Sequence, residues 1–173
     1  MSFQNNASAL AKAMGTRGLF GFLYKGRYYL VYNHFDSYPE GLGRDLVYEI
    51  QHGQIGEWLE LLTKLKVICD DDKTLPTQED IEKLAPYTEL DVSDCSTDDW
   101  YCLTHKCQGS FIRVLESGYL LSYLPRGEME RGLVGDIMIE YQYILDFDHN
   151  QFIVRSYDEN EQVYNLDNLP LFA

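Results

Sequence analysis

The chain has 173 residues, of which 45% are apolar and 14% aromatic; this is enough apolar surface for one folded domain and excludes a wholly disordered chain. Its formal net charge of −14, without any stripe of basic residues, excludes nucleic acid and anionic membranes as main partners. No apolar run approaches the ~20 residues that span a bilayer, and the start lacks the pattern of a secretory signal. We therefore expect a soluble, acidic, intracellular protein, located in the cytoplasm or in a virion.

The N-terminal part of the chain predicts a β-hairpin. Residues 1–14 are small and polar and are predicted to be an extension, whereas residues 15–173 are predicted to form a single domain. Within that domain, residues 19–24 and 27–34 are rich in aromatic and β-branched side chains, and the pair Lys25-Gly26 between them suits a tight turn.

The second strand of this hairpin has two distinct faces. Because side chains alternate along a strand, Tyr28, Leu30, Tyr32 and His34 are expected to share one face.

The middle of the chain predicts helices. Apolar residues at helical spacing follow from residues 42–44 to Gly53 and again over residues 55–65. Thr77 and Asp80 match a capping box, which predicts the start of a third helix. A fourth helix is expected from Trp100, capped by Ser96 or Thr97, to a left-handed Gly118; His105 lies off its apolar stripe and is expected at the surface.

The C-terminal part returns to strands, over residues 119–124, 137–147, 152–157 and 163–166. Strands thus flank a helical middle section. The predicted class is α+β, with a mostly antiparallel sheet built from the N-terminal and C-terminal hairpins.

The four cysteines, Cys69, Cys95, Cys102 and Cys107, are expected to be free thiols, mostly buried. Zinc is an alternative, with His105 as a further ligand, but the spacings do not match the close pairs of structural zinc sites. We therefore predict no metal and no cofactor.

The predicted site lies where the second strand ends and the first helix begins, and we call residues 33–44 the bend. Asn33, His34, Asp36, Ser37 and Tyr38 concentrate polar side chains there. His34 can act as a general base if Asp36 orients it, so these two residues are the candidate catalytic pair. A Ser37/His34/Asp36 triad at such short spacing is unusual, because triad members normally meet through tertiary structure.

Two other interpretations of the bend stay open. The stretch Gly41-Leu-Gly-Arg44 places backbone N–H groups and an arginine at a helix start, where they would bind a phosphate or carboxylate with the help of Arg17 and His34. The structural alternative assigns Asp36 and Ser37 to a turn, gives the two glycines positive φ angles, and hydrogen-bonds His34 within the loop.

Two segments resemble a known family. Gly15-Thr-Arg-Gly-Leu-Phe-Gly-Phe22 and Tyr32-Asn-His-Phe-Asp-Ser-Tyr-Pro-Glu-Gly-Leu-Gly43 are similar to small uncharacterised proteins of fungi, large DNA viruses and phages, which open with Met-Gly-Thr-Arg-Gly and carry Asn-His-x-Asp-Ser-Tyr-Pro. The segment from Ile139 to Asp148 also resembles the closing hairpin of that family. The resemblance implies where a site lies and no mechanism, and the chain departs from the family in the residues before Met14.

The expected function is a non-enzymatic accessory module that binds a protein partner or a small anionic ligand through Arg17, Asn33, His34, Asp36, Ser37, Tyr38 and Arg44. The alternative is a small hydrolase or transferase that acts on an anionic substrate, with His34 as base. A third possibility is self-association into a homo-oligomer through tyrosine-rich strands or an unpaired sheet edge.

Overall fold

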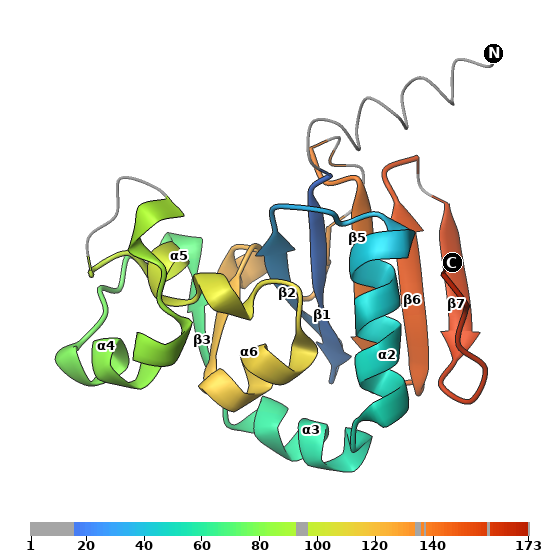
Figure 1. The fold of residues 1–173 in the computed structure, drawn as a ribbon, viewed down its shortest axis with the longest axis horizontal. Coiled ribbons are helices and arrows are strands. Elements are labelled where there is room, and N and C mark those ends of the chain that lie inside the picture. Colours follow the sequence, from blue (N-terminus) through green and yellow to red (C-terminus); the bar gives the residue numbers. More distant parts are fainter. Residues whose placement is uncertain (1–15, 93–96, 134–135, 137, 159, 173) are drawn as a thin grey trace.

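The computed structural model describes residues 16–172 without 93–96, 134–135, 137 and 159 (Figure 1). The predicted extension, residues 1–14, lies outside the described residues. The strands are β1 (Gly18–Tyr24), β2 (Arg27–Asn33), β3 (Lys66–Cys69), β4 (Tyr119–Ser122), β5 (Tyr141–Asp146), β6 (Gln151–Ser156) and β7 (Glu161–Asn165). The α-helices are α2 (Arg44–His52), α3 (Ile55–Thr63), α4 (Gln78–Leu84), α5 (Trp100–Leu103) and α6 (Phe111–Ser117).

Five strands form the main sheet in the order β2-β1-β5-β6-β7. All neighbours are antiparallel except β1 and β5, which run parallel and join the N-terminal hairpin to the C-terminal strands. The predicted α+β class, with a mostly antiparallel sheet and a helical middle section, is confirmed. Among the described residues, no helix has the length and apolar composition needed to cross a bilayer.

The N-terminal hairpin turns where the sequence predicts it. Lys25 and Gly26 have φ angles of 51° and 73°, the left-handed values that a tight two-residue turn requires. The carboxylate of Asp148, between β5 and β6, accepts hydrogen bonds from the N–H groups of Lys25 (2.7 Å) and Gly26 (2.9 Å). These hydrogen bonds therefore link the turn of the N-terminal hairpin to the turn of the C-terminal hairpin.

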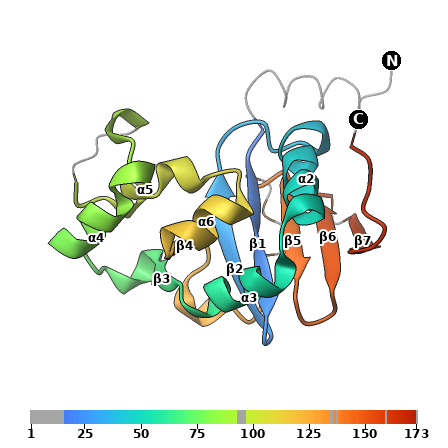
Figure 2. The same ribbon diagram turned by 60° about the horizontal axis from the view of Figure 1, so that its bottom comes forward.

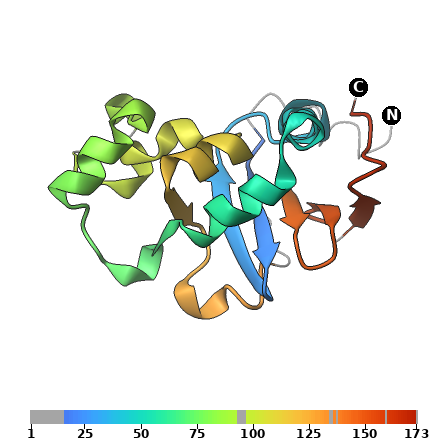
Figure 3. The ribbon, with the colours of Figure 1, turned by 90° about the horizontal axis from the view of Figure 1, so that it is seen from below.

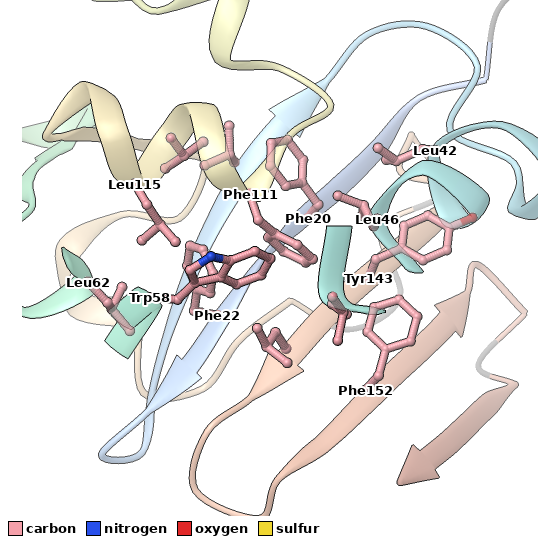
Figure 4. Close-up of a cluster of buried hydrophobic side chains, with 14 of the residues drawn as sticks. Phe20, Phe22, Leu42, Leu46, Trp58, Leu62, Phe111, Leu115, Tyr143 and Phe152 are labelled. Atoms are coloured by element: carbon pink, nitrogen blue, oxygen red, sulfur yellow. The ribbon is translucent and has the colours of Figure 1, made fainter. Parts of the chain in front are cut away.

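Helices α2, α3 and α6 cover one face of the main sheet (Figures 1 and 3). Their apolar side chains meet those of the sheet in the largest core cluster, which Figure 4 shows. Phe111 of α6 lies at its centre, with its ring 5.8 Å from Phe20, 5.2 Å from Phe22 and 5.9 Å from Trp58. Buried aromatic pairs at these distances stabilise the packing beyond the area they bury.

The opposite face of the sheet is covered by the connection that follows β4, which lies on the other side of the strands in Figure 3. Leu124 and Met129 of this connection pack against Leu19, Leu30 and Ile144 of the sheet. Both faces of the central strands are consequently buried.

A second, two-stranded sheet was not predicted. The helix expected over residues 55–65 ends at Thr63, and β3 follows and pairs in parallel with β4. Tyr123, directly after β4, donates its N–H to the carbonyl of Leu30 in β2 (2.8 Å). The small sheet therefore lies beside the β2 edge of the main sheet, as Figure 2 shows.

The single helix predicted from Trp100 to Ser117 is wrong, because two α-helices and a 3-10 turn occupy this stretch. Gly109 lies between α5 and α6, and its φ of +87° interrupts the helical conformation there. The caps are Asp99 and Ser110, whose side chains accept the N–H groups of Tyr101 and Arg113. Of the expected caps, Thr97 lies two residues before the cap Asp99, and Ser96 lies outside the described residues.

Two other signals of the helical middle are confirmed. Gly118 ends α6 with a φ of +80°. The capping box of α4 is complete, since Thr77 Oγ1 accepts the N–H of Asp80 (3.2 Å) and Asp80 Oδ2 accepts the N–H of Thr77 (2.9 Å).

Candidate functional site

The bend is a hydrogen-bonded corner at the end of β2. The Asn33 amide donates to the carbonyl of Phe35 and to the hydroxyl of Ser37, both at 2.8 Å. Asn33 is 7% exposed and Ser37 is fully buried. The backbone of Ser37 is also held, because its N–H donates to Thr16 O (3.1 Å) and its carbonyl accepts the hydroxyl of Tyr143 (2.7 Å). Asn33 and Ser37 thus fix the shape of the bend.

The backbone N–H groups at the start of α2 have partners within the chain. A π-helical turn, Pro39–Gly43, precedes the helix, and the N–H groups of Gly41 and Leu42 donate to Tyr38 O (3.0 Å) and Asp36 O (2.9 Å). A Cβ atom at Gly41 would lie 2.4 Å from Asp36 O, so close approach of the backbone explains this glycine. The expected positive φ does not explain Gly43, whose φ is −56°. The N–H groups of Gly43 and Arg44 also donate within the chain, to Tyr38 O (3.5 Å) and to the carbonyls of Pro39 and Gly41. Since these donors are already bonded, the backbone of this helix start does not supply the anion-binding N–H groups that the sequence suggested.

The charged residues predicted for the site lie mostly at the surface. Asp36 and Arg44 are exposed, and Asp36 has the left-handed φ of 54° expected of a turn residue. Tyr38 and Arg17 are half-buried, and the N–H of Arg17 donates to Glu140 Oε2.

Tyr32, and not Asp36, orients the imidazole of His34. The Tyr32 hydroxyl lies 2.7 Å from Nδ1 of His34, and the backbone N–H of His34 donates to Oε1 of Gln108 (3.0 Å). The Ser37 hydroxyl is bonded to Asn33. A Ser37/His34/Asp36 triad is therefore not assembled. The alternation of β2 already places Tyr32 and His34 on one face, and that signal could have identified the pair.

A cavity of about 660 Å³ opens beside this pair, between β2, the β3–β4 sheet, residues 70–75 and α5. We call it the aromatic cavity, because its lining includes Tyr32, Trp100, Tyr101, Tyr119 and Tyr123. Its volume and mostly apolar lining are those of sites that enclose small organic ligands.

Hydrogen bonds and ring stacking hold several side chains of this cavity in place. Trp100 Nε1 donates to the carbonyl of Thr74 (2.6 Å), which ties α5 to residues 70–75. The Tyr32 and Tyr123 rings stack with centroids 6.0 Å apart. The Ser122 hydroxyl donates to Leu124 O (2.9 Å). The lining is therefore largely preformed, which lowers the entropy cost of binding.

Two thiols face this cavity in their neutral form. Cys69 and Cys107 are free, and burial raises the pKa of both thiols, that of Cys107 to about 11. The prediction of free thiols is wrong for Cys102, which is disulfide-bonded, and Cys95 lies outside the described residues.

The zinc alternative does not fit this arrangement, because Nδ1 of His105 pairs with Glu89 Oε2 (2.9 Å) and Cys102 is disulfide-bonded. His105 is half-buried, so it is at the surface only in part.

One group of described residues has the spacing of metal ligands: Cys69, Asp71 and Asp72. Arg126 already binds both carboxylate oxygens of Asp72, at 2.6 and 3.0 Å, and this hydrogen bonding lowers the pKa of that carboxyl to about 2. The guanidinium therefore takes the position that a cation would need.

A second cavity, of about 500 Å³, lies on the other side of Gln108. Asn33 and Phe35 of the bend line it together with Lys106 and Arg113. In the described part of the chain, neither cavity has Arg17, His34, Asp36 or Arg44 in its lining.

Comparison of the chain with family models, curated proteins and solved structures finds no match. The function must therefore be inferred from the geometry of this chain alone.

Proposed function

We propose that the protein is a non-enzymatic binding module that encloses a small organic ligand in the aromatic cavity. The observation that carries this proposal is a cavity of about 660 Å³, lined by five aromatic rings that the fold holds in place. A largely apolar pocket of this size encloses most of the surface of a small organic molecule.

The bend does not line the aromatic cavity, but His34 is bonded to two residues that do. Tyr32 lines the cavity and is bonded to His34, and Gln108 lines both cavities and accepts the His34 N–H. Replacing His34 by Ala is expected to weaken binding through Tyr32, whereas Asp36→Ala, at an exposed turn, is expected to leave it unchanged.

Loss of an aromatic side chain tests the proposal. We expect an aromatic fragment at ~100 times its dissociation constant to stabilise the wild type by ~2.7 kcal/mol, seen as a rise in melting temperature. Tyr101→Ala, in the lining, should reduce the rise at the same concentration. Tyr48→Ala, an exposed tyrosine on α2, is the matched control and should leave it unchanged. Equal rises for both variants would contradict the proposal.

The second cavity supports a second candidate ligand, a small anion. Lys106 and Arg113 are in its lining, and its carboxylate, Glu89, pairs with His105. Positively charged groups in such a cleft raise the local concentration of an anionic ligand. Inorganic phosphate or phosphorylated small molecules should then stabilise the wild type more than Lys106→Ala; an equal effect on both would exclude this ligand.

Several expectations stay predictions. These are the resemblance to proteins of fungi, large DNA viruses and phages, the cytoplasmic or virion location, the hydrolase or transferase alternative, and self-association. Strand β7, at an edge of the main sheet with Val163 47% exposed, is the surface on which self-association would rest. Light scattering over a broad concentration range tests that last expectation, and a monomer throughout would contradict it.

A further inference from the structure

The aromatic rings of the cavity can bind positive charge. Trp, Tyr and Phe carry negative potential on their ring faces and attract ammonium and guanidinium groups within about 6 Å of the ring centroid. The protein places one of its own cations in this way, because Lys66 Nζ lies 5.5 Å from the centroid of Trp100 and 5.9 Å from that of Tyr119. The Lys66 charge is balanced by Asp80, 3.0 Å away. Two rings of the cavity thus already lie within cation–π distance of an ammonium group whose charge a carboxylate balances.

The charged residues of the lining also favour a positive ligand. Asp70, Asp98 and Asp99 contribute carboxylates, of which that of Asp99 also caps α5, against the single ammonium of Lys73. Asp70 and Asp98 are exposed, so they lie where the cavity meets solvent, and we call these two residues the rim. Carboxylates at the mouth of a low-dielectric cavity attract cations and repel anions.

The polar groups deeper in the lining offer few free hydrogen-bond donors to an anion. The hydroxyls of Thr104 and Ser122 donate to the backbone carbonyls of Trp100 (2.8 Å) and Leu124 (2.9 Å). The indole N–H of Trp100 donates to Thr74 O. Their protons are therefore already bonded, while apolar side chains such as Ile68 and Leu120 form much of the remaining lining.

We propose that the ligand of the aromatic cavity is an organic cation, in which an ammonium group meets the tyrosine and tryptophan rings and the aspartates of the rim while an apolar body fills the interior. This inference rests on the proposed function and adds the chemical class of the ligand.

Three probes of similar shape and different charge test the proposal by calorimetric titration of the full chain. Phenyltrimethylammonium is cationic, tert-butylbenzene is its neutral counterpart, and benzenesulfonate is anionic. We expect the cation to bind at least about tenfold more tightly than the neutral probe, because the ring faces and the rim carboxylates act only on the charge. The anion should bind more weakly than both.

Charge-neutralising variants separate the contribution of the rim carboxylates to binding from that of the aromatic rings. The double variant Asp70→Asn/Asp98→Asn should weaken binding of the cation several-fold and leave the neutral probe unchanged. The variant Asp45→Asn/Asp167→Asn removes two exposed carboxylates outside the cavity lining and serves as the control. The effect of the rim variant should shrink as salt is raised from 0.05 to 0.5 M, because salt screens exposed charges.

The outcomes distinguish the two proposals. If the neutral probe or the anion binds as tightly as the cation, the cationic class is wrong and the cavity remains a ligand site. If the control pair weakens the cation as much as the rim pair does, the rim assignment is wrong. If none of the three probes binds, both the cationic ligand and the proposed function fail.

Discussion

The hydroxyl of Tyr119 donates a hydrogen bond of 2.6 Å to Oδ1 of Asp80. The same carboxylate accepts from Lys66 Nζ at 3.0 and 3.1 Å and from the N–H of Thr77 at 2.9 Å. One buried carboxylate thus joins β3, β4 and the start of α4. Because Tyr119 lines the aromatic cavity, Asp80 holds part of the cavity in position.

Replacing Asp80 by Asn is expected to lower the free energy of unfolding by about 2–3 kcal/mol at pH 7, because it breaks a buried, charge-assisted network. Burial acts to raise the pKa of this carboxyl, but the hydrogen bonds from Tyr119, Thr77 and Lys66 outweigh it and the pKa is lowered. The stabilisation is therefore present above the unfolded-state pKa of about 4 and is lost as the pH falls through the folded-state pKa. The difference between wild type and variant should shrink below pH 4 in urea unfolding.

The control for this variant is Glu79→Gln, in the same helix. Glu79 forms an exposed ion pair with Lys83, of a kind that contributes little to stability. Equal losses for the two variants would show that Asp80 does not have the structural role assigned to it.

The network of Asp80 also indicates what the sequence can and cannot predict. The Thr77–Asp80 capping box is local, so its spacing in the sequence was sufficient to identify it. Lys66 and Tyr119 come together because β3 and β4 pair in parallel with Lys66 opposite Tyr119. A parallel pair needs a long connection, and four residues of β3 after a helix give too short an apolar pattern to reveal it.

The aromatic cavity was missed for a related reason. Its rings come from three separate parts of the chain, around Tyr32, Trp100 and Tyr123, and each part by itself has the pattern of ordinary core. The hairpins were predicted correctly because strand alternation and the Lys25-Gly26 turn are local signals. The position of the bend was likewise evident from its polar residues, but their partners, among them Gln108 and Tyr143, lie far away in the sequence.

For Glu49 we expect a dependence of stability on pH opposite in sign to that expected for Asp80. Its carboxylate in α2 accepts from the Ser110 hydroxyl (2.6 Å) and the Phe111 N–H (2.7 Å) at the start of α6. Burial raises the pKa of Glu49, more than these donors lower it. Its contribution to stability is therefore complete below the unfolded-state pKa and is lost as the pH rises through the folded-state pKa. The stability of wild type relative to Glu49→Gln should fall between pH 4 and pH 7; a rise over that range would contradict the assignment.

Gly18 is expected to tolerate no side chain, because a Cβ atom there would lie 2.6 Å from Ser37 Cβ and 3.0 Å from Tyr141 O. Gly18→Ala should therefore displace the bend from β1 and destabilise the protein by about 1–3 kcal/mol. Gly56→Ala is the matched control, since no heavy atom lies within 4 Å and the residue is in α3. That substitution should stabilise the protein by about 0.5–1 kcal/mol. Thermal unfolding of both variants measures the contrast, and a stabilised Gly18→Ala would refute it.

Cys107 is expected to react slowly with alkylating reagents. Because only the thiolate reacts and burial raises the pKa of this thiol to about 11, iodoacetamide at pH 8 should modify it roughly two orders of magnitude more slowly than an exposed cysteine. Mass spectrometry follows the modification, with Cys107→Ser to assign the peptide and unfolding in urea to restore the normal rate. Complete modification of the folded protein within minutes would contradict the buried, neutral thiol.

The most direct test of the account is to map where small aromatic molecules bind. Backbone amide resonances of the ¹⁵N-labelled protein would be followed during titration with cationic, neutral and anionic aromatic fragments. If the aromatic cavity is the ligand site, the shifted resonances should belong to residues 68–75, 98–104 and 119–123. Shifts confined to residues 36–44 or to the C-terminal strands, or no shifts with any fragment, would contradict it.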